Sequence, residues 1–242
     1  MYAIETFDLT KKYKDVVAVN GLNLRVEEGE LYSLLGVNGA GKTTAIRMLS
    51  CIVAPTSGDA RLNGKSIVTE EGEVKRMIAV SPQETAVAAG LTVKENLELI
   101  CGLHSYKREK TAEKIRQLTE SLGLEGVLTK KAGKLSGGMQ RRLSIAMALA
   151  CEPSILFLDE PTLGLDVLAR AELWDIIRSL RGKVTIILTT HYMEEAEALS
   201  DRVGIMRDGV LLLSATVDEI KQRAECESFE EAFIKIVKEA KK

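Results

Sequence analysis

A glycine-rich segment near the N-terminus has the residue types and the spacing of a phosphate-binding loop. Within the segment 36–44, residues 36–43 fit the pattern G-x-x-x-x-G-K-[ST]. Backbone N–H groups of such a loop bind phosphate oxygens, the lysine adds positive charge near the β- and γ-phosphates, and the hydroxyl suits Mg²⁺. The residues expected to bind nucleotide phosphates are Gly36, Val37, Asn38, Gly39, Ala40, Gly41, Lys42, Thr43 and Thr44.

Two carboxylates follow an apolar run in the second half of the chain. Residues 155–158 are apolar, as in a buried parallel strand, and Asp159 and Glu160 come directly after them. Acidic groups in such a position are costly unless they hold a metal ion or a proton. We expect Asp159 to hold Mg²⁺, directly or through its water shell, and Glu160 to orient or deprotonate an attacking water. No segment matches a kinase catalytic loop or a G-protein base-recognition motif, so the sequence favours hydrolysis over transfer to a second substrate.

Three further segments carry candidates whose local signals allow two interpretations each. A lone histidine more often makes a structural hydrogen bond than a catalytic contact, but His191 follows the apolar run 184–188, and this position at a strand end, like that of Asp159, raises the odds of a catalytic role. The Ser-Gly-Gly turn at 136–138 precedes a helix and suits either an anion or a plain N-cap. Tyr13, flanked by three lysines, suits either stacking on a base or an ordinary half-exposed position.

The phosphate loop needs a strand before it and a helix after it. The apolar run 31–35 predicts a buried strand, and residues 43–50 predict a helix whose N-terminus faces the phosphate. Alternating apolar residues earlier in the chain predict strands at 3–7, 16–19 and 22–26. Asn20-Gly21 predicts a hairpin-type turn between the last two of these strands.

The hydrophobic periodicity changes from 2 to 3.6 after residue 84. Thr92 and Glu95 have the spacing of a capping box, and apolar residues then recur at helical intervals. We therefore expect residues 85–150 to be helical and to be inserted between two halves of an α/β core. A hairpin and a final amphipathic helix are predicted to close the chain.

Composition limits the class of protein. The 242 residues include 33 Lys+Arg and 35 Asp+Glu, so the charge balance gives no reason to expect nucleic acid as a partner. The four cysteines are widely spaced, which predicts reduced thiols rather than disulfides or a zinc site. No apolar run approaches the roughly 18 residues that span a bilayer, and no signal peptide is recognisable. We therefore expect a cytosolic protein unless a partner tethers it.

The order of the motifs resembles the ABC ATPase (nucleotide-binding domain) family from about residue 2 to about residue 215. Any one of these motifs is weak alone, whereas their sequence along the chain is specific. The motifs are the phosphate loop, Gln83, Leu135-Ser-Gly-Gly138, Leu156-Phe-Leu-Asp-Glu-Pro161, Gly164-Leu-Asp166 and His191.

The resemblance implies a role for each matching residue. Tyr13 stacks on adenine, Gln83 links Mg²⁺ and water to the transporter contact, and His191 contacts the γ-phosphate. The implied catalytic set is Glu160, His191 and Gln83, and the implied Mg²⁺ set is Thr43, Gln83 and Asp159. The residues implied to complete the nucleotide site across a dimer are Ser136, Gly137, Gly138 and Asp166.

The resemblance also implies the fold and the partners. The implied fold is a RecA-like P-loop α/β core with an antiparallel β portion and an inserted helical subdomain. The expected units are the core at 1–84 and 151–215, the helical subdomain at 85–150, and a short C-terminal helix and tail at 216–242. The implied partners are a second copy or a homologous cassette and an integral membrane permease, which places the chain at the inner face of the cell membrane, with ATP and Mg²⁺ bound.

Two features point to a subfamily. Met139 and the segment 190–195, Thr-His-Tyr-Met-Glu-Glu, look more like drug-, lipid- or sodium-exporting members than like sugar or amino-acid importers. Two other classes remain as alternatives. One is a soluble ABC-type ATPase acting on nucleic acid or ribosomes, which usually carries tandem cassettes, coiled-coil arms or zinc inserts that this sequence lacks. The other is a nucleotide-gated binding module with little turnover, which the presence of Glu160 and His191 disfavours.

Overall fold

A parallel sheet forms the centre of the molecule. The computed structural model describes residues 1–240, so Lys241 and Lys242 of the predicted tail lie outside the described residues. The strands lie in the order β11–β10–β4–β9–β8–β7, and neighbours are parallel except for the β10–β11 hairpin. Their bounds are β4 Leu31–Leu35, β7 Ile78–Ser81, β8 Ile155–Asp159, β9 Thr185–Thr190, β10 Arg202–Arg207 and β11 Val210–Ala215.

The register of this sheet aligns the ends of three strands that carry predicted site residues. Leu35 of β4 pairs with Thr190 of β9, and Asp159 of β8 pairs with Thr189 of β9. Every residue of these strands is buried because each strand is covered on both faces. Chemistry-bearing side chains can therefore reach solvent only where the strands end, at their common carboxyl edge.

An antiparallel sheet lies against the parallel one. Its long central strand β1 (Tyr2–Tyr13) pairs with β2, β3 and β5, and β6 pairs with β5 at the edge of the sheet. The other strands are β2 Val16–Leu22, β3 Arg25–Glu27, β5 Ser57–Leu62 and β6 Lys65–Ser66. The hairpin turn predicted at Asn20-Gly21 is wrong, because both residues lie inside β2 and β2 does not pair with β3.

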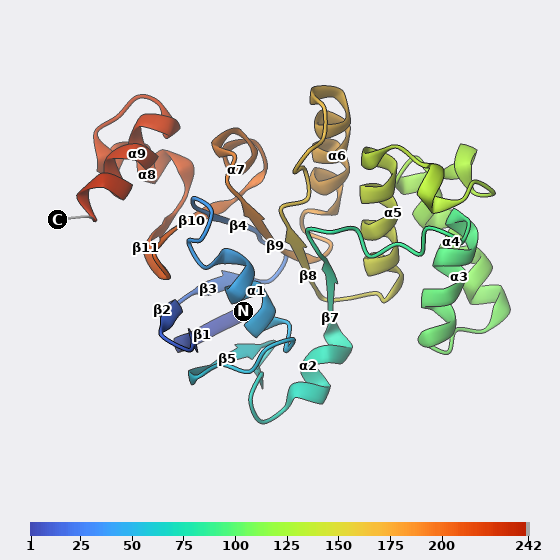
Figure 1. Cartoon of the computed structure of the whole chain (residues 1–242), viewed down its shortest axis with the longest axis horizontal. Coiled ribbons are helices and arrows are strands. Elements are labelled where there is room, and N and C mark those ends of the chain that lie inside the picture. The colour runs from blue at the N-terminus through green and yellow to red at the C-terminus, as the bar shows by residue number, and fades with distance from the viewer. Residues whose placement is uncertain (241–242) are drawn as a thin grey trace.

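The helix after the phosphate loop lies between the two sheets (Figure 1). In α1 (Lys42–Leu49), Ile46 and Leu49 belong to the same buried cluster as Ile4 of the antiparallel sheet and Phe157 of the parallel sheet. At roughly 1.5–3 kcal/mol for each buried aliphatic or aromatic side chain, this cluster holds the start of α1 firmly against the strand ends.

Helices gather at one end of the parallel sheet, beyond β7 and β8 (Figure 1). Thr92 and Glu95 form the predicted capping box of the first of them, which is confirmed. The helices of this end are α3 Val93–Leu103, α4 Arg108–Ser121, η1 Glu125–Val127, η2 Ala132–Lys134 and α5 Gly137–Ala150. The other helices before residue 200 are α2 Glu71–Met77, α6 Val167–Leu180 and α7 Met193–Leu199. Helix α2 was not expected from the sequence.

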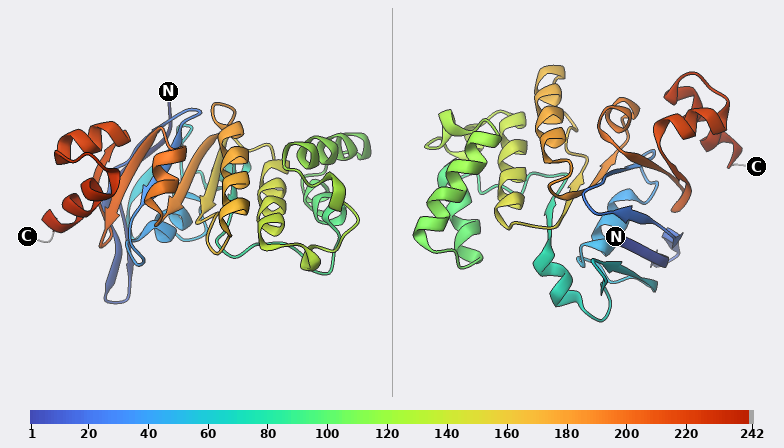
Figure 2. Two further views of the ribbon diagram at one scale, coloured as in Figure 1. Left: turned by 90° about the horizontal axis from the view of Figure 1, so that it is seen from above. Right: turned by 180° about the vertical axis from the view of Figure 1, so that it is seen from behind.

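The C-terminal segment differs from the single helix predicted for 216–242. Two helices, α8 (Val217–Ala224) and α9 (Phe229–Glu239), are separated where Glu225 adopts a left-handed conformation with φ 52°. Separate N-caps at Thr216 and Ser228 start them. They lie at the opposite end of the sheet from α3 and α4 in both views of Figure 2.

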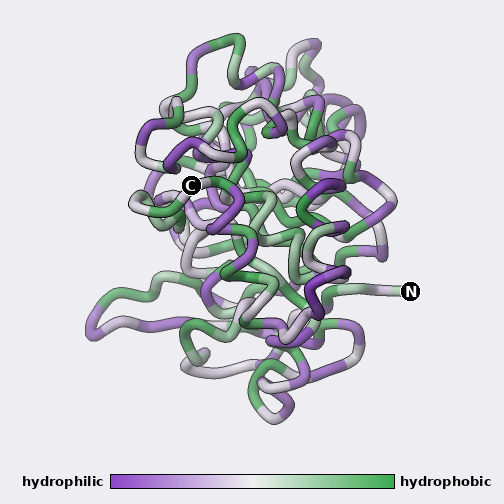
Figure 3. Tube along the Cα trace, turned by 90° about the vertical axis from the view of Figure 1, so that its right-hand side faces the viewer, coloured by the Kyte–Doolittle hydropathy of each residue, from purple (hydrophilic) through white to green (hydrophobic). Residues whose placement is uncertain are grey.

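Hydrophilic and hydrophobic residues are interspersed along the helices. Figure 3 views the end of the molecule that carries α3 and α4 and shows this mixing along the tube. Within residues 1–240, none of the helices combines the length and the hydropathy that a bilayer crossing requires.

Candidate active site

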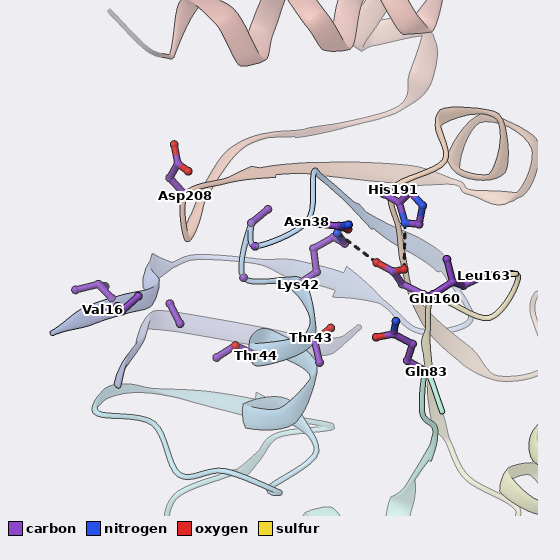
Figure 4. A pocket seen from close by; sticks show the side chains of 15 residues that line it. Val16, Asn38, Lys42, Thr43, Thr44, Gln83, Glu160, Leu163, His191 and Asp208 are labelled. Carbon is purple, nitrogen blue, oxygen red and sulfur yellow. Dashed lines mark hydrogen bonds and ion pairs between the residues drawn. The ribbon is translucent and has the colours of Figure 1, made fainter. Parts of the chain in front are cut away.

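A cavity of about 710 Å³ opens at the carboxyl edge of the parallel sheet, over the start of α1. Figure 4 shows side chains from the phosphate loop and from the residues just after β7, β8 and β9 converging on it. The predicted residues on its wall are Asn38, Gly39, Ala40, Gly41, Lys42, Thr43, Thr44, Gln83, Glu160 and His191. Gly36, Val37 and Asp159 are not on this wall, although each is in direct contact with a residue that is.

Two glycines of the loop lie so close to neighbouring backbone that no side chain fits at their positions. A Cβ at Gly36 would lie 2.3 Å from the carbonyl oxygen of Met206, and a Cβ at Gly41 would lie 2.4 Å from that of Ala18. Gly41 also has φ 100° and forms the N-cap of α1. A side chain at either position would displace neighbouring backbone, so the shape of the loop depends on both.

Lys42 is buried under the loop that precedes it. Its Nζ donates to the carbonyl oxygens of Gly36, at 2.7 Å, and Val37, at 3.2 Å, and lies 3.5 Å from Oε1 of Glu160. Burial lowers the pKa of the Lys42 ammonium, and the charge of Glu160 opposes that shift. Its Nζ is thus fixed between the two loop carbonyls and Glu160, where the loop faces the cavity.

Oxygen donors suited to a magnesium ion meet at the start of α1. The Thr43 hydroxyl donates to Oδ1 of Asp159 at 3.1 Å, and the Thr189 hydroxyl donates to the same oxygen at 2.5 Å. Gln83 reaches toward this region from the segment just beyond β7 (Figure 4). Hydroxyl, carboxylate and amide oxygens are the hard donors that Mg²⁺ prefers alongside phosphate and water, so this donor set fits the ion.

Glu160 is fixed in an unusual backbone conformation. Its φ is 46°, in the left-handed region that costs an ordinary residue about 1–2 kcal/mol. The Glu160 N–H donates to the carbonyl oxygen of Thr189 at 3.1 Å and to its hydroxyl at 3.0 Å. Its Oε2 lies 3.0 Å from Nδ1 of His191, as drawn in Figure 4. Strain of this kind is typical of functional positions held by their surroundings.

Four predicted residues lie away from this cavity. Ser136 caps α5 by accepting a hydrogen bond from the Met139 N–H at 3.3 Å, and Asp166 caps α6 by accepting one from the Ala169 N–H at 2.9 Å. Gly137 lines a smaller neighbouring cavity, which it shares with Gln83 and Leu163, whereas Ser136, Gly138 and Asp166 line neither cavity. Within one chain, the structure therefore does not bring these residues to the phosphate loop.

Tyr13 also lies outside the cavity wall. It is 41% exposed at the end of β1, with the Nζ of Lys11 5.1 Å from its ring centroid. Its strand partner Val16 does line the cavity. The wall residues that the sequence analysis missed are Val16, Val17, Ala18, Leu163 and Asp208. Val16, Val17, Ala18 and Leu163 carry no reactive group, and Asp208 belongs to an Asp-Gly pair that predicts only a turn. No sequence pattern therefore identifies these residues as part of the site.

Comparisons with known proteins agree with this construction. The model of the ABC transporter family matches residues 19–163, more than half of the chain. The chain is 41% identical over 220 residues to "Daunorubicin/doxorubicin resistance ATP-binding protein DrrA" of Streptomyces peucetius, covering 90% of this chain and 67% of that protein. It is 38% identical over 240 residues to "Probable multidrug ABC transporter ATP-binding protein YbhF" of Escherichia coli (strain K12), covering 97% of this chain but only 41% of that protein.

A solved structure extends the agreement to three dimensions. The "ATP binding subunit of ABC transporter" superimposes with a TM-score of 0.86 at 27% identity, covering 97% of this chain and 99% of the other. The α/β fold class expected from the sequence, with its antiparallel β portion and helical insertion, is confirmed. By sequence, fold and site geometry alike, the chain belongs to the ABC transporter family as an ATP-binding cassette.

Proposed function

We propose that the chain binds Mg-ATP in the cavity at Lys42 and hydrolyses it as the ATP-binding subunit of a transporter with a separate membrane subunit. One observation carries this proposal: a single carboxylate, Glu160, contacts both the phosphate-loop lysine and His191 on the wall of the cavity. A site that only bound nucleotide would not need a buried, strained carboxylate in this position.

Each side chain has a distinct task in the proposed reaction. Lys42 and the N–H groups at the start of α1 bind the phosphates. Glu160 accepts a proton from the attacking water, and His191 holds the Glu160 carboxylate in place through Nδ1. Thr43, Asp159 and Gln83 are the residues that would hold Mg²⁺, which when bound neutralises charge on the β- and γ-phosphate oxygens.

A second subunit completes the proposed site. Ser136, Gly138 and Asp166 lie off the cavity, and pairing two cassettes head to tail would place the partner subunit's Ser136 opposite Lys42. Exposed apolar residues next to Asp166 support an interface there, since Val167 is 70% exposed and Leu168 is 77% exposed. Either a second copy of this chain or a homologous cassette fits this role.

The cargo pathway is proposed to lie in an integral membrane permease. Relatives named for daunorubicin and doxorubicin resistance and for multidrug transport support export as the direction and drug-like molecules as the class of cargo. The chain would then be cytoplasmic and peripheral at the inner face of the cell membrane, attached through the permease. The helical region 85–150 is proposed to be a separate subdomain and begins two residues after Gln83. We propose that this region responds to the nucleotide.

Phosphate release tests this function. The purified chain is expected to release phosphate from ATP, to stop when EDTA removes Mg²⁺, and to gain specific activity as its concentration rises, because dimers complete the site. Release that stays at the buffer background at every concentration, with and without the co-expressed permease, would contradict the proposal.

A further inference from the structure

One buried cation has no task in the proposed reaction. Arg141 lies in the second turn of α5 and is 5% exposed. Its Nη1 donates to the carbonyl oxygen of Pro82 and its Nη2 to that of Gln83, each at 2.5 Å. Burial lowers the pKa of its guanidinium, and the negative charge of Asp159 opposes that shift.

The two carbonyls are those of consecutive residues just beyond β7. A planar guanidinium presents two parallel N–H donors in a rigid arrangement and so fixes the direction of both carbonyls. A lysine can also donate to two carbonyls, as Lys42 does, but from a single rotating ammonium, and an apolar side chain can donate to neither. The contact joins segments 58 and 59 residues apart in the sequence. It therefore fixes the backbone of Gln83 relative to the helix that Ser136 caps.

Gln83 faces two cavities. Its side chain lines the cavity of the phosphate loop, and it also lines the smaller one together with Gly137 and Arg141. Arg141 thus ties a residue facing the nucleotide to the helix whose first turn holds Gly137 and Gly138. Burying a guanidinium costs free energy, so an apolar residue would hold α5 in place more cheaply if packing were its only role.

We propose that Arg141 is a positioning residue that couples Gln83 to the Ser136–Gly138 turn. When Gln83 moves toward bound Mg-ATP, Arg141 moves the start of α5 with it. This movement brings the Ser136–Gly138 turn into position to contact the nucleotide of the partner cassette. When Gln83 withdraws, the turn withdraws as well. This inference rests on the proposed function, because it requires ATP turnover at a dimer-completed site.

A double-mutant cycle tests the coupling. Arg141→Lys keeps the positive charge but removes the two parallel N–H donors of the guanidinium. The matched control is Arg142→Lys in the same helix, where the guanidinium pairs with Glu172. We expect Arg141→Lys to lower kcat for phosphate release about tenfold and to keep the Kd for trinitrophenyl-ATP within about threefold of the unmodified chain. For the control Arg142→Lys, both kcat and Kd should stay within about twofold of the unmodified chain. In a Gln83→Ala background, Arg141→Lys is expected to lower kcat by less than about twofold further. An equal loss in both backgrounds would overturn the proposal.

Hydrogen exchange gives a readout that needs no change at Arg141. With Mg-ATP in excess, exchange at residues 137–145 is expected to slow in the unmodified chain and to stay unchanged in Gln83→Ala, although this variant still binds trinitrophenyl-ATP. Equal slowing in both proteins would also overturn the coupling. Failure of the proposed function itself is distinguishable, because the unmodified chain would then release no phosphate before any substitution is made.

Discussion

Nδ1 of His191 lies 3.0 Å from Oε2 of Glu160, and the two residues directly follow the adjacent strands β9 and β8. The other carboxylate oxygen of Glu160 lies 3.5 Å from Nζ of Lys42. Glu160 is therefore fixed from two sides by residues expected to contact phosphate. The predictions below separate nucleotide binding from turnover around this carboxylate.

Replacing Glu160 by glutamine is expected to stop turnover and to preserve binding. The amide keeps the size of the side chain but cannot accept a proton from water, so kcat is expected to fall roughly 10²- to 10⁴-fold. ATP should stay bound and a dimer should accumulate, which size-exclusion chromatography at saturating Mg-ATP can measure.

The exposed Glu194 in the first turn of α7 provides the control for this substitution. Glu194→Gln is expected to keep the kcat of the unmodified chain within about twofold, as surface substitutions usually do. If Glu160→Gln elutes only as a monomer under saturating Mg-ATP, the assignment of Glu160 is wrong.

Replacing Lys42 by alanine is expected to weaken nucleotide binding. A hydrogen bond to a charged group contributes about 1.5–3 kcal/mol, so the Kd for Mg-ATP should rise roughly 10- to 100-fold. Isothermal titration calorimetry measures this Kd directly. Lys75→Ala, which removes only a surface ion pair with Glu71, should leave the Kd unchanged. An unchanged Kd in Lys42→Ala would show that the loop does not bind the phosphates.

Glu195 is expected to stabilise the fold as a neutral acid. Its Oε1 accepts hydrogen bonds from the Thr162 hydroxyl at 2.8 Å and from Trp174 Nε1 at 3.1 Å, and the residue is fully buried. Glu195→Ala would leave both donors unpaired and is expected to cost about 1–3 kcal/mol of unfolding free energy. Glu195→Gln can still accept both bonds and should cost less than about 1 kcal/mol near pH 5.

The pH dependence of stability tests the protonation of Glu195. Burial raises the pKa of this carboxyl above 4.5, so the folded chain keeps a proton that the unfolded chain releases. The stability gained in this way is present below pH 4.5 and is lost as the pH rises through the raised pKa. Urea unfolding followed by the fluorescence of Trp174, the single tryptophan, should therefore show a loss of stability as the pH rises above 4.5 that Glu195→Gln lacks. Parallel pH profiles for the two proteins would contradict this.

The phosphate loop and the acidic strand end were predictable because their signals are local. Lys42 and Thr43 lie in one eight-residue pattern, and Asp159 ends an apolar run, so a short window of sequence specifies each. The continuous apolar runs also indicate parallel strands buried on both faces, although the order of the strands in the sheet does not follow from them. The roles assigned to these residues remain predictions for the experiments above.

The misplaced hairpin shows where local signals fail. Asn20-Gly21 has the composition of a two-residue turn, yet the strand continues to Leu22, which pairs with Leu9 of β1. The register shifts beyond Leu9, and the Gly21 N–H donates to the Thr10 hydroxyl. The glycine, with φ 59°, therefore lies in an irregular part of β2, because a long β1 can pair with β2 and β3 at once.

Arg141 and Glu195 were beyond prediction for a different reason. Arg141 contacts backbone carbonyls, which have no sequence signature, and Glu195 contacts Thr162 across 33 residues. Each looks like an ordinary charged residue of a helix until the packing of that helix is known. Their partners depend on tertiary structure, which local periodicity does not encode.

Mixing two inactive variants tests the dimer-completed site most directly. Lys42→Ala lacks a working phosphate loop, and Ser136→Arg, at an exposed position, blocks the turn that is proposed to face a partner. A head-to-tail heterodimer of the two holds one intact site, so an equimolar mixture should recover up to about a quarter of the unmodified activity by random pairing. Phosphate release by the mixture that does not exceed the sum of the separate variants would contradict a site shared between two subunits.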